Sequence, residues 1–330
     1  MARVHLPGRR KRDHPRASLS ILKSPSSEKA RMPIDHEFGG QHTELKLSIV
    51  EGYLKAFTLA LRSRFQHLWY VDAFAGTGSR TVRTERRGAD LVEMPVEEAV
   101  ERRRGSAQIA LDVQPAFDFL VFIEKNPNYI SALNDLVAKN LQRRIVVAEE
   151  DANSALKRLV ANNNWRDKRA VVFLDPYGME VEWSTLAALA TTQAIDVWFL
   201  FPLAGLFRQA TRKLTDIDEH KRAALTRMFG SKSWEAELYP DGEPDMFGVL
   251  PERKRELDPR GLERYVQSRL SEIFGAVLEP LALPIGRGPQ MFSLFLCISN
   301  RTPEAIGLAR RIGSHLLDPK RHLIVRSPTQ

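Results

Sequence analysis

The sequence predicts an α/β fold built on a mainly parallel sheet with helices on both faces. Short apolar runs rich in β-branched and aromatic residues recur along the chain, and segments of helix length separate most of them. Polar residues gather where these runs end, and ligands of open parallel sheets bind at the carboxyl ends of the strands. A length of 330 residues suits one large α/β domain or two small ones.

Each element has its own signal. Residues 42–65 place apolar side chains at helical spacing without an internal proline, which predicts a long amphipathic helix. Proline at the first turn indicates a second helix over 127–141, and 154–164 and 303–317 also read as helices. The predicted strands are 68–76, 117–126, 144–153, 169–178 and 194–202, with a closing pair at 276–285 and 291–300. Two insertions are expected, at 79–117 and, mostly helical, at 208–274.

The first 33 residues differ from the rest in composition. They hold nine Lys or Arg and two acids, so they account for +7 of the net charge of +8. Because the segment is rich in Pro, Ser and Arg and lacks periodicity, we expect a disordered basic arm, followed by one domain over 34–330. The arm suits phosphate contacts, an unselected extension or a targeting peptide.

Composition and motifs limit the cellular location and the kinds of site that are expected. No apolar run reaches the roughly 18 residues expected of a membrane span. The one cysteine, Cys297, excludes an internal disulfide and indicates a reducing compartment, so a cytoplasmic location is expected. Because Cys297 stands in an apolar run, a buried structural thiol is favoured over a nucleophile. No metal-ligand spacing and no G-x-S-x-G hydrolase motif is present.

Four successive strands deliver polar groups to one edge of the predicted sheet. The first ends in "DAFAGTG", which holds the predicted cofactor-binding residues Asp72, Phe74, Gly76 and Gly78. Glycines in such a loop let the backbone approach a ligand closely. Glu124 follows the second strand and is predicted to hold ribose hydroxyls. Asp151 and Asn153 follow the third strand and are predicted to meet an adenine edge. Asp175-Pro176-Tyr177 follows the fourth strand. A dinucleotide is disfavoured, because "GTGSRT" lacks a third glycine.

This series resembles the class I S-adenosylmethionine-dependent methyltransferases, which have a glycine loop after the first strand and a D/N-P-P-Y/F turn after the fourth. The resemblance implies a Rossmann-like, seven-stranded sheet and S-adenosylmethionine as cofactor. It also implies a catalytic role for Asp175, Pro176 and Tyr177: the carboxylate and the proline carbonyl orient a target amine, and the ring stacks on the base. The turn here is D-P-Y-G, closer to the D-P-F-G of tRNA guanine dimethyltransferases, so the base stays open.

A second resemblance covers nearly the whole chain after the arm. The segments "FGGQHTELKLSIVEGYLKAF", "YVDAFAGTG", "FIEKNPNYISAL" and "VFLDPYGMEVEWSTLAALA" are similar to the three-Cys-motif partner (TcmP) family. These are bacterial proteins named for a neighbouring gene product that resembles radical-SAM proteins. The resemblance implies that neighbour-encoded protein as a partner.

The layout is also similar to a ribosomal-RNA adenine methyltransferase family with an N-terminal lysine-bearing segment. On that resemblance His42, Lys46 and Ser106 are predicted to bind substrate, with Lys46 a phosphate or cofactor contact. The alternative is a polar helix start, with Thr43 as its cap. Arginines at 80–87 and 102–104 suit substrate phosphates or a solvated face.

Two functional hypotheses follow. The first is methyl transfer to an exocyclic amine of a nucleic-acid base, with RNA favoured over DNA. The second is a non-catalytic, nucleotide-binding partner of the neighbour-encoded three-Cys-motif protein. The glycine loop and Asp175 are common to both.

Overall fold

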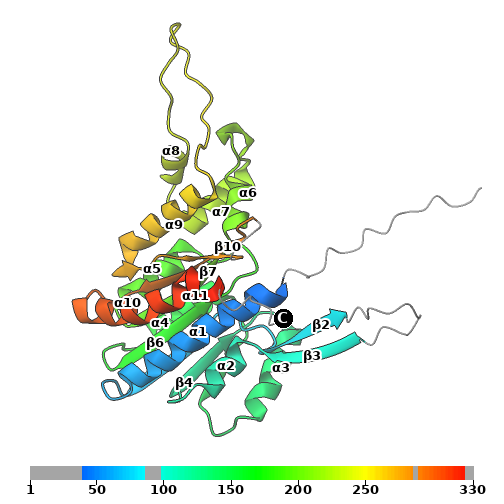
Figure 1. Cartoon of the computed structure of the whole chain (residues 1–330). Helices are drawn as coiled ribbons and strands as arrows, with labels where there is room; N and C mark the ends of the chain where they lie inside the picture. Colours follow the sequence, from blue (N-terminus) through cyan, green and yellow to red (C-terminus); the bar gives the residue numbers. More distant parts are fainter. Residues whose placement is uncertain (1–38, 86–97, 285–288, 324–330) are drawn as a thin grey trace, which may run out of the picture. The chain divides into compact units, whose positions relative to one another are not determined.

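The computed structural model describes residues 39–85, 98–284 and 289–323, and its central feature is one twisted sheet (Figure 1). The sheet runs in the order β5-β4-β1-β6-β7-β10-β8, and β9 also pairs with β10. Its strands are β1 (His67–Asp72), β4 (Phe119–Ile123), β5 (Ile145–Ala148), β6 (Lys168–Leu174), β7 (Ile195–Phe201), β8 (Ala276–Val277), β9 (Leu281–Leu283) and β10 (Phe292–Ile298).

The pairing directions confirm the predicted fold class. The strands from β5 to β7 pair in parallel, whereas β10 lies antiparallel between β7 and the short strands β8 and β9. An antiparallel strand inserted at this place in an otherwise parallel sheet belongs to the class I methyltransferase fold. The expected sixth strand is split into β8 and β9, which contact different parts of β10. Cys297 of β10 is fully buried opposite Val197, as expected of a structural thiol.

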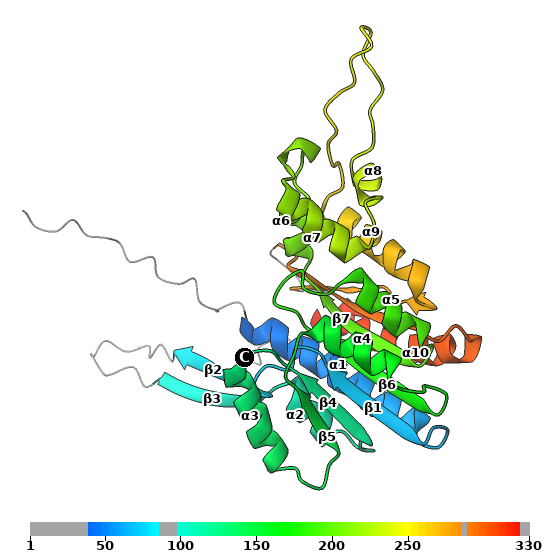
Figure 2. The ribbon, with the colours of Figure 1, turned by 180° about the vertical axis from the view of Figure 1, so that it is seen from behind.

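Two helical layers cover the sheet, and Figures 1 and 2 view them from opposite sides. One apolar cluster joins the sheet to α1, α2 and α10, and another joins its other face to α4, α5 and α9. Strand residues alternate between the clusters, as a pleated strand buried on both faces requires. The helices named here are α1 (Gly39–Leu61), α2 (Ser106–Asp112), α3 (Pro127–Ala138), α4 (Ala152–Ala161), α5 (Trp183–Thr191), α9 (Pro259–Ile273) and α10 (Pro303–Leu317).

The first helix begins earlier than the sequence indicates. Because α1 starts at Gly39, Thr43 lies inside the helix, and its interpretation as an N-terminal cap is wrong. The helix also ends at Leu61 instead of Phe65, where a turn leads into β1. Its buried face carries Leu47, Val50 and Leu54 against the sheet, as the apolar spacing predicts.

Two further segments occupy the predicted insertions. Strands β2 (Ser79–Glu85) and β3 (Glu98–Arg104) form a separate antiparallel ribbon after β1. Between β7 and β8 lie α6 (Leu203–Gln209), a 3₁₀ turn (Leu214–Asp216), α7 (Glu219–Phe229), α8 (Trp234–Leu238) and α9. Residues 240–252, between α8 and α9, are all exposed and extend away from these helices (Figure 1).

The predicted N-terminal arm, residues 1–33, lies outside the described residues. Within the described ranges, no helix combines the length and the apolar character that crossing a bilayer would need.

Candidate functional site

The carboxyl ends of four parallel strands bring the predicted residues to one rim of the sheet. Asp72 ends β1, and Glu124, Asp151 and Asp175 follow β4, β5 and β6 in that order. The strand order reverses between β1 and β6, so these two strands border the topological switch point at which open α/β sheets bind ligands. Asp72 and Asp175 therefore stand on either side of that switch point, referred to below as the crevice.

Asp72 is a fully buried carboxyl group. It accepts hydrogen bonds from the Ser106 hydroxyl, from the Tyr70 hydroxyl at 3.3 Å and from the Phe74 amide at 3.4 Å. Burial, reinforced by the negative charge of Asp175, raises the pKa of Asp72 to about 7 against these hydrogen bonds. Ser106, predicted from the sequence to bind substrate, thus bonds directly to a predicted cofactor residue.

The two glycines of the loop after β1 have different surroundings. Both have positive φ, +57° at Gly76 and +70° at Gly78. A Cβ at Gly76 would meet no atom within 4 Å, so the backbone there faces open space. A Cβ at Gly78 would lie 2.9 Å from Leu136 and 3.2 Å from Leu133 of α3. Gly76 therefore suits close approach of a ligand, whereas Gly78 lets the loop pack against α3.

Glu124 is held rigidly by main-chain amides. Its Oε1 accepts hydrogen bonds from the amides of Lys125 and Asn126, both at 2.9 Å, and its Oε2 accepts one from Gly76 at 3.0 Å. The residue is 8% exposed. The carboxylate therefore ties the end of β4 to the glycine loop and keeps acceptor capacity for a ligand hydroxyl.

Asp175 forms an ion pair with Lys46, which α1 delivers to the rim. The Lys46 side chain is 7% exposed and that of Asp175 is 27% exposed, so the pair is partly sealed from water. The Lys46 ammonium also lies 5.8 Å from the centre of the Phe173 ring. The family resemblance predicted Lys46 as a phosphate or cofactor contact near the site, and its observed partner is the predicted catalytic carboxylate.

Tyr177 presents its ring to solvent. It is 79% exposed, while Pro176 before it is buried. Its hydroxyl pairs with that of Tyr129 on α3, a residue that the sequence pattern did not single out. A ring that is largely exposed can stack on a planar ligand.

Asn153 braces the loop that follows β6 instead of opening to the rim. It is 8% exposed, its Nδ2 donates to the Glu180 carbonyl at 2.9 Å, and its Oδ1 accepts from Glu182 N at 3.0 Å and from Thr185 Oγ1 at 2.8 Å. Asp151 is exposed and caps α4, accepting a hydrogen bond from the Ser154 amide at 3.1 Å. Of these two, only Asp151 is accessible from solvent.

Other predicted and unpredicted residues complete the rim. Phe74 is partly buried against the apolar cluster on the α4 and α5 side, and the side chain of His42 lies outside the described part of the structure. Lys125 and Glu180, which sequence reasoning missed, form an ion pair at 2.9 Å across the rim. Each follows a predicted motif residue by a few positions, and nothing in its local sequence indicates this contact. Within the described ranges, no three His, Cys, Asp or Glu side chains are placed to hold a metal ion.

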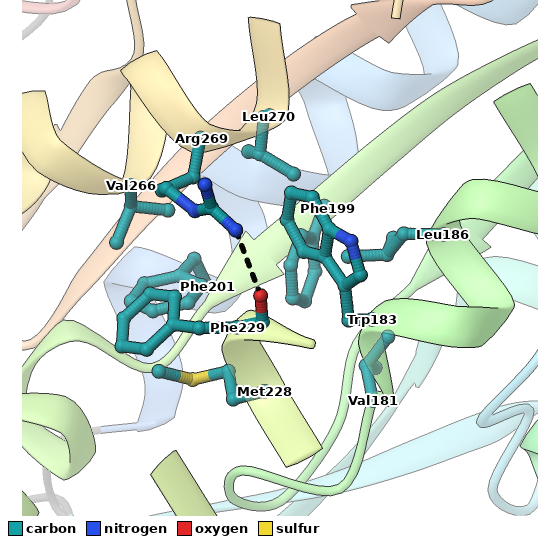
Figure 3. Close-up of a pocket in the computed structure, with 10 residues that line it drawn as sticks. All are labelled: Val181, Trp183, Leu186, Phe199, Phe201, Met228, Phe229, Val266, Arg269 and Leu270. Atoms are coloured by element: carbon teal, nitrogen blue, oxygen red, sulfur yellow. Dashed lines mark hydrogen bonds between the residues drawn. The ribbon is translucent and has the colours of Figure 1, made fainter. Parts of the chain in front are cut away.

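A small cavity below the loop after β6 is packing and not a ligand site. Its volume is about 10 Å³, barely room for one water, and its walls are mainly apolar (Figure 3). Arg269 of α9 crosses it, donating to the Phe229 carbonyl at 3.0 Å and lying 5.1 Å from the centre of the Trp183 ring. These contacts fasten the segment between β7 and β8 to α5.

Comparison with known proteins gives distant structural matches. No family model matches the sequence, and no curated protein matches it. Solved structures that match include protein LPL1258 from Legionella pneumophila, of family DUF519, at 15% identity and a TM-score of 0.45 over 86% of this chain and 95% of that one. A methyltransferase from Clostridium acetobutylicum described as S-adenosylmethionine-dependent matches at 9% identity and 0.33, over 78% and 92%. A putative methyltransferase from Thermobifida fusca matches at 10% and 0.35, over 78% and 81%.

All three TM-scores lie below 0.5, so the fold is described from the topology of the sheet and not from these matches. The chain has the mixed α/β architecture of class I methyltransferases, with its order of strands and its antiparallel β10. Membership of the three-Cys-motif partner family stays a prediction.

Proposed function

We propose that the chain transfers a methyl group from S-adenosylmethionine to an exocyclic amine of a nucleic-acid base. One observation carries the proposal: Asp72 and Asp175 border the switch point, and the exposed ring of Tyr177 stands two residues after Asp175. A carboxylate acceptor and an accessible ring at that crevice suit a planar substrate bearing an amine.

The residues on the β1 and β4 side fit the cofactor. The open space at Gly76 admits a ligand against the backbone, and Glu124 is oriented to accept hydrogen bonds from ribose hydroxyls. Among the described residues no cation contacts the buried Asp72, so an ammonium group arriving beside it would relieve its desolvation. Asp151 is accessible for an adenine amine. When bound, S-adenosylmethionine supplies an electrophilic methyl group.

The residues on the β6 side fit the acceptor. Lys46 holds Oδ2 of Asp175, which leaves Oδ1 to accept a hydrogen bond from the target amine. With the Pro176 carbonyl as a second acceptor, the amine lone pair would be aimed into the crevice, and Tyr177 would stack on the base. As the acceptor of the amine's hydrogen bond, Asp175 would also take the proton that the amine loses. The catalytic gain is then mainly positioning, on the order of 7 kcal/mol or more for well-oriented reactants.

A second candidate is a non-catalytic, nucleotide-binding partner of a neighbour-encoded three-Cys-motif protein. The ion pair between Lys46 and Asp175 favours it, because an amine must share the carboxylate with a resident ammonium group.

Calorimetry with S-adenosylmethionine and S-adenosylhomocysteine tests the cofactor. We expect wild type to bind both, and Gly76→Arg to bind neither while remaining folded, because the arginine would fill the open space at the loop. Failure of wild type to bind either form would refute the cofactor assignment.

Transfer of a radiolabelled methyl group into total cellular RNA and DNA tests the chemistry, with and without the neighbour-encoded protein. Asp175→Ala should abolish incorporation and keep most cofactor affinity, because its partner is the substrate. Tyr177→Phe should stay active, whereas Tyr177→Ala should lose roughly 1–3 kcal/mol of base binding. Asp135→Ala, an exposed position on α3, is the control. Equal incorporation by wild type and Asp175→Ala would refute the proposal, and absence of incorporation by every form would favour the second candidate.

A further inference from the structure

A cavity of about 290 Å³ opens at the edge of the sheet opposite the rim, near the lower end of the roughly 300–1,000 Å³ typical of small-molecule sites. It lies between α1 and α10, over the first residues of β6 and β7 and the last of β10. Its apolar wall is formed by Phe57, Leu61, Phe65, Leu308 and Ile312. None of these residues belongs to the candidate active site.

One carboxyl group stands on the floor of this cavity. Asp196, the second residue of β7, faces the layer of α1 and α10, where its neighbours along the strand are apolar. Its Oδ2 accepts a hydrogen bond from the Tyr53 hydroxyl at 2.7 Å. Among the hydrogen bonds of the described residues, none is donated to Oδ1.

Nearby cations compensate Asp196 only in part. The guanidinium of Arg169 donates to the carbonyls of Trp165 and Lys168 and stacks on Phe65 at 3.9 Å, so it does not hydrogen-bond to Asp196. Burial accordingly raises the pKa of Asp196 to about 6, although the Tyr53 hydrogen bond and the charge of Arg169 lower it. Near neutral pH the cavity therefore holds a carboxylate for which the described residues provide no donor to Oδ1, beside a mainly apolar wall. Arg64, Asn300, Thr302 and Glu304 also line the cavity.

We propose that this cavity binds a small amphipathic amine, with its ammonium group on Asp196 and its apolar body between α1 and α10. An ammonium donates to the open oxygen and adds a positive charge in direct contact with Asp196, which Arg169 does not provide, and an aryl or alkyl body buries apolar surface against the wall. An alcohol would donate a hydrogen bond to Oδ1 of Asp196 but would bring no positive charge, and a carboxylate would repel Asp196. The proposal is independent of the proposed methyl transfer, because it uses none of the same residues.

Calorimetry of the full chain at pH 7.5 with three probes of one shape tests this assignment: 2-phenylethylamine, 2-phenylethanol and phenylacetate. We expect the amine to bind at least tenfold more tightly than the alcohol, and phenylacetate more weakly still. Asp196→Asn, which keeps an acceptor for Tyr53, should reduce the amine to the affinity of the alcohol. Glu304→Gln removes an exposed carboxylate from the edge of the same cavity and should change amine affinity less than twofold.

A second variant guards against misfolding of Asp196→Asn. Ala305 is a half-buried residue of α10 that lines the cavity. Ala305→Phe would place a ring in the cavity and should abolish binding of the amine and of the alcohol alike. The proposal is overturned if wild type binds none of the probes, if the amine and the alcohol bind equally, or if Asp196→Asn retains the preference for the amine.

Discussion

Replacing Asp72 with asparagine should stabilise the folded chain, and by more at high pH than at low pH. The buried carboxyl has a pKa of about 7, against an ordinary value of 3.8 in the unfolded chain. Because the native state binds this proton more tightly, its stabilising contribution is complete below about pH 4 and is lost as the pH rises through about 7. Asparagine keeps the shape and an acceptor for Ser106 and Phe74 but carries no charge.

The magnitude follows from the difference between the two pKa values. At about 1.4 kcal/mol for each pH unit, the ionisable carboxyl, compared with a permanently neutral group, lowers the free energy of unfolding by about 4 kcal/mol at pH 8 and by about 2 kcal/mol at pH 5. At pH 5 this cost arises because the unfolded chain ionises whereas the native carboxyl stays protonated. The increase in the free energy of unfolding on Asp72→Asn should show the same dependence on pH. It should be smaller by the free energy of any hydrogen bond that asparagine makes less well than aspartate. A buried carboxylate that destabilises the fold is expected where a cationic group of a ligand binds to it. The stabilised variant should therefore also lose cofactor affinity.

Urea unfolding of wild type and Asp72→Asn at pH 5 and pH 8, followed by circular dichroism, measures both values. Asp135→Asn is the control, because a substitution at an exposed surface carboxylate should stay within about 0.5 kcal/mol of wild type at both pH values. Equal gains at the two pH values would refute the reasoning, and so would a loss of stability at pH 8.

Three further outcomes are expected. Asn153→Ala should lower the free energy of unfolding by about 1–3 kcal/mol, measured by urea unfolding, because it leaves buried polar partners in the loop after β6 unsatisfied. Gly78→Ala should destabilise the chain by about 2 kcal/mol more than Gly76→Ala in the same assay, because both positions have positive φ but only Gly78 packs against α3. Replacing the exposed residues 242–250, which lie between the ion-paired Asp241 and Glu252, with a short Gly-Ser linker should leave the Tm unchanged within error, and a drop of several degrees would show that the segment packs on the domain.

The sequence predicted the parts of the fold that depend on local pattern. Apolar runs and helix-length spacers placed β1, β4, β5, β6 and β7, because burial on both faces leaves a continuous signal in each strand. The rim followed from these strands, because carboxyl ends of parallel strands meet at one edge. The sequence could not separate residues that face the crevice from those that brace it.

Asn153 shows why that distinction is out of reach of the sequence. Its partners lie 27 to 32 residues away, and only packing of α4 against α5 brings them within hydrogen-bond distance. The contact between Lys46 and Asp175 spans 129 residues, and that between Tyr53 and Asp196 spans 143. Lys46 and Tyr53 lie on α1 seven positions apart, which is two helical turns. One face of this helix therefore contacts the carboxyl end of β6 and the amino end of β7.

Burial of the one cysteine has a practical use for spectroscopy. Burial, reinforced by the charge of Asp196, raises the pKa of the Cys297 thiol well above its ordinary value, so maleimide reagents should leave it unmodified in the native chain. A cysteine introduced at an exposed position would then be the one reactive thiol, with no background to remove by mutagenesis. Two introduced cysteines, at position 247 and on α3, would carry paired dyes that report the distance between these positions in single molecules. One introduced cysteine at position 177 would carry a nitroxide that senses a ligand entering the crevice.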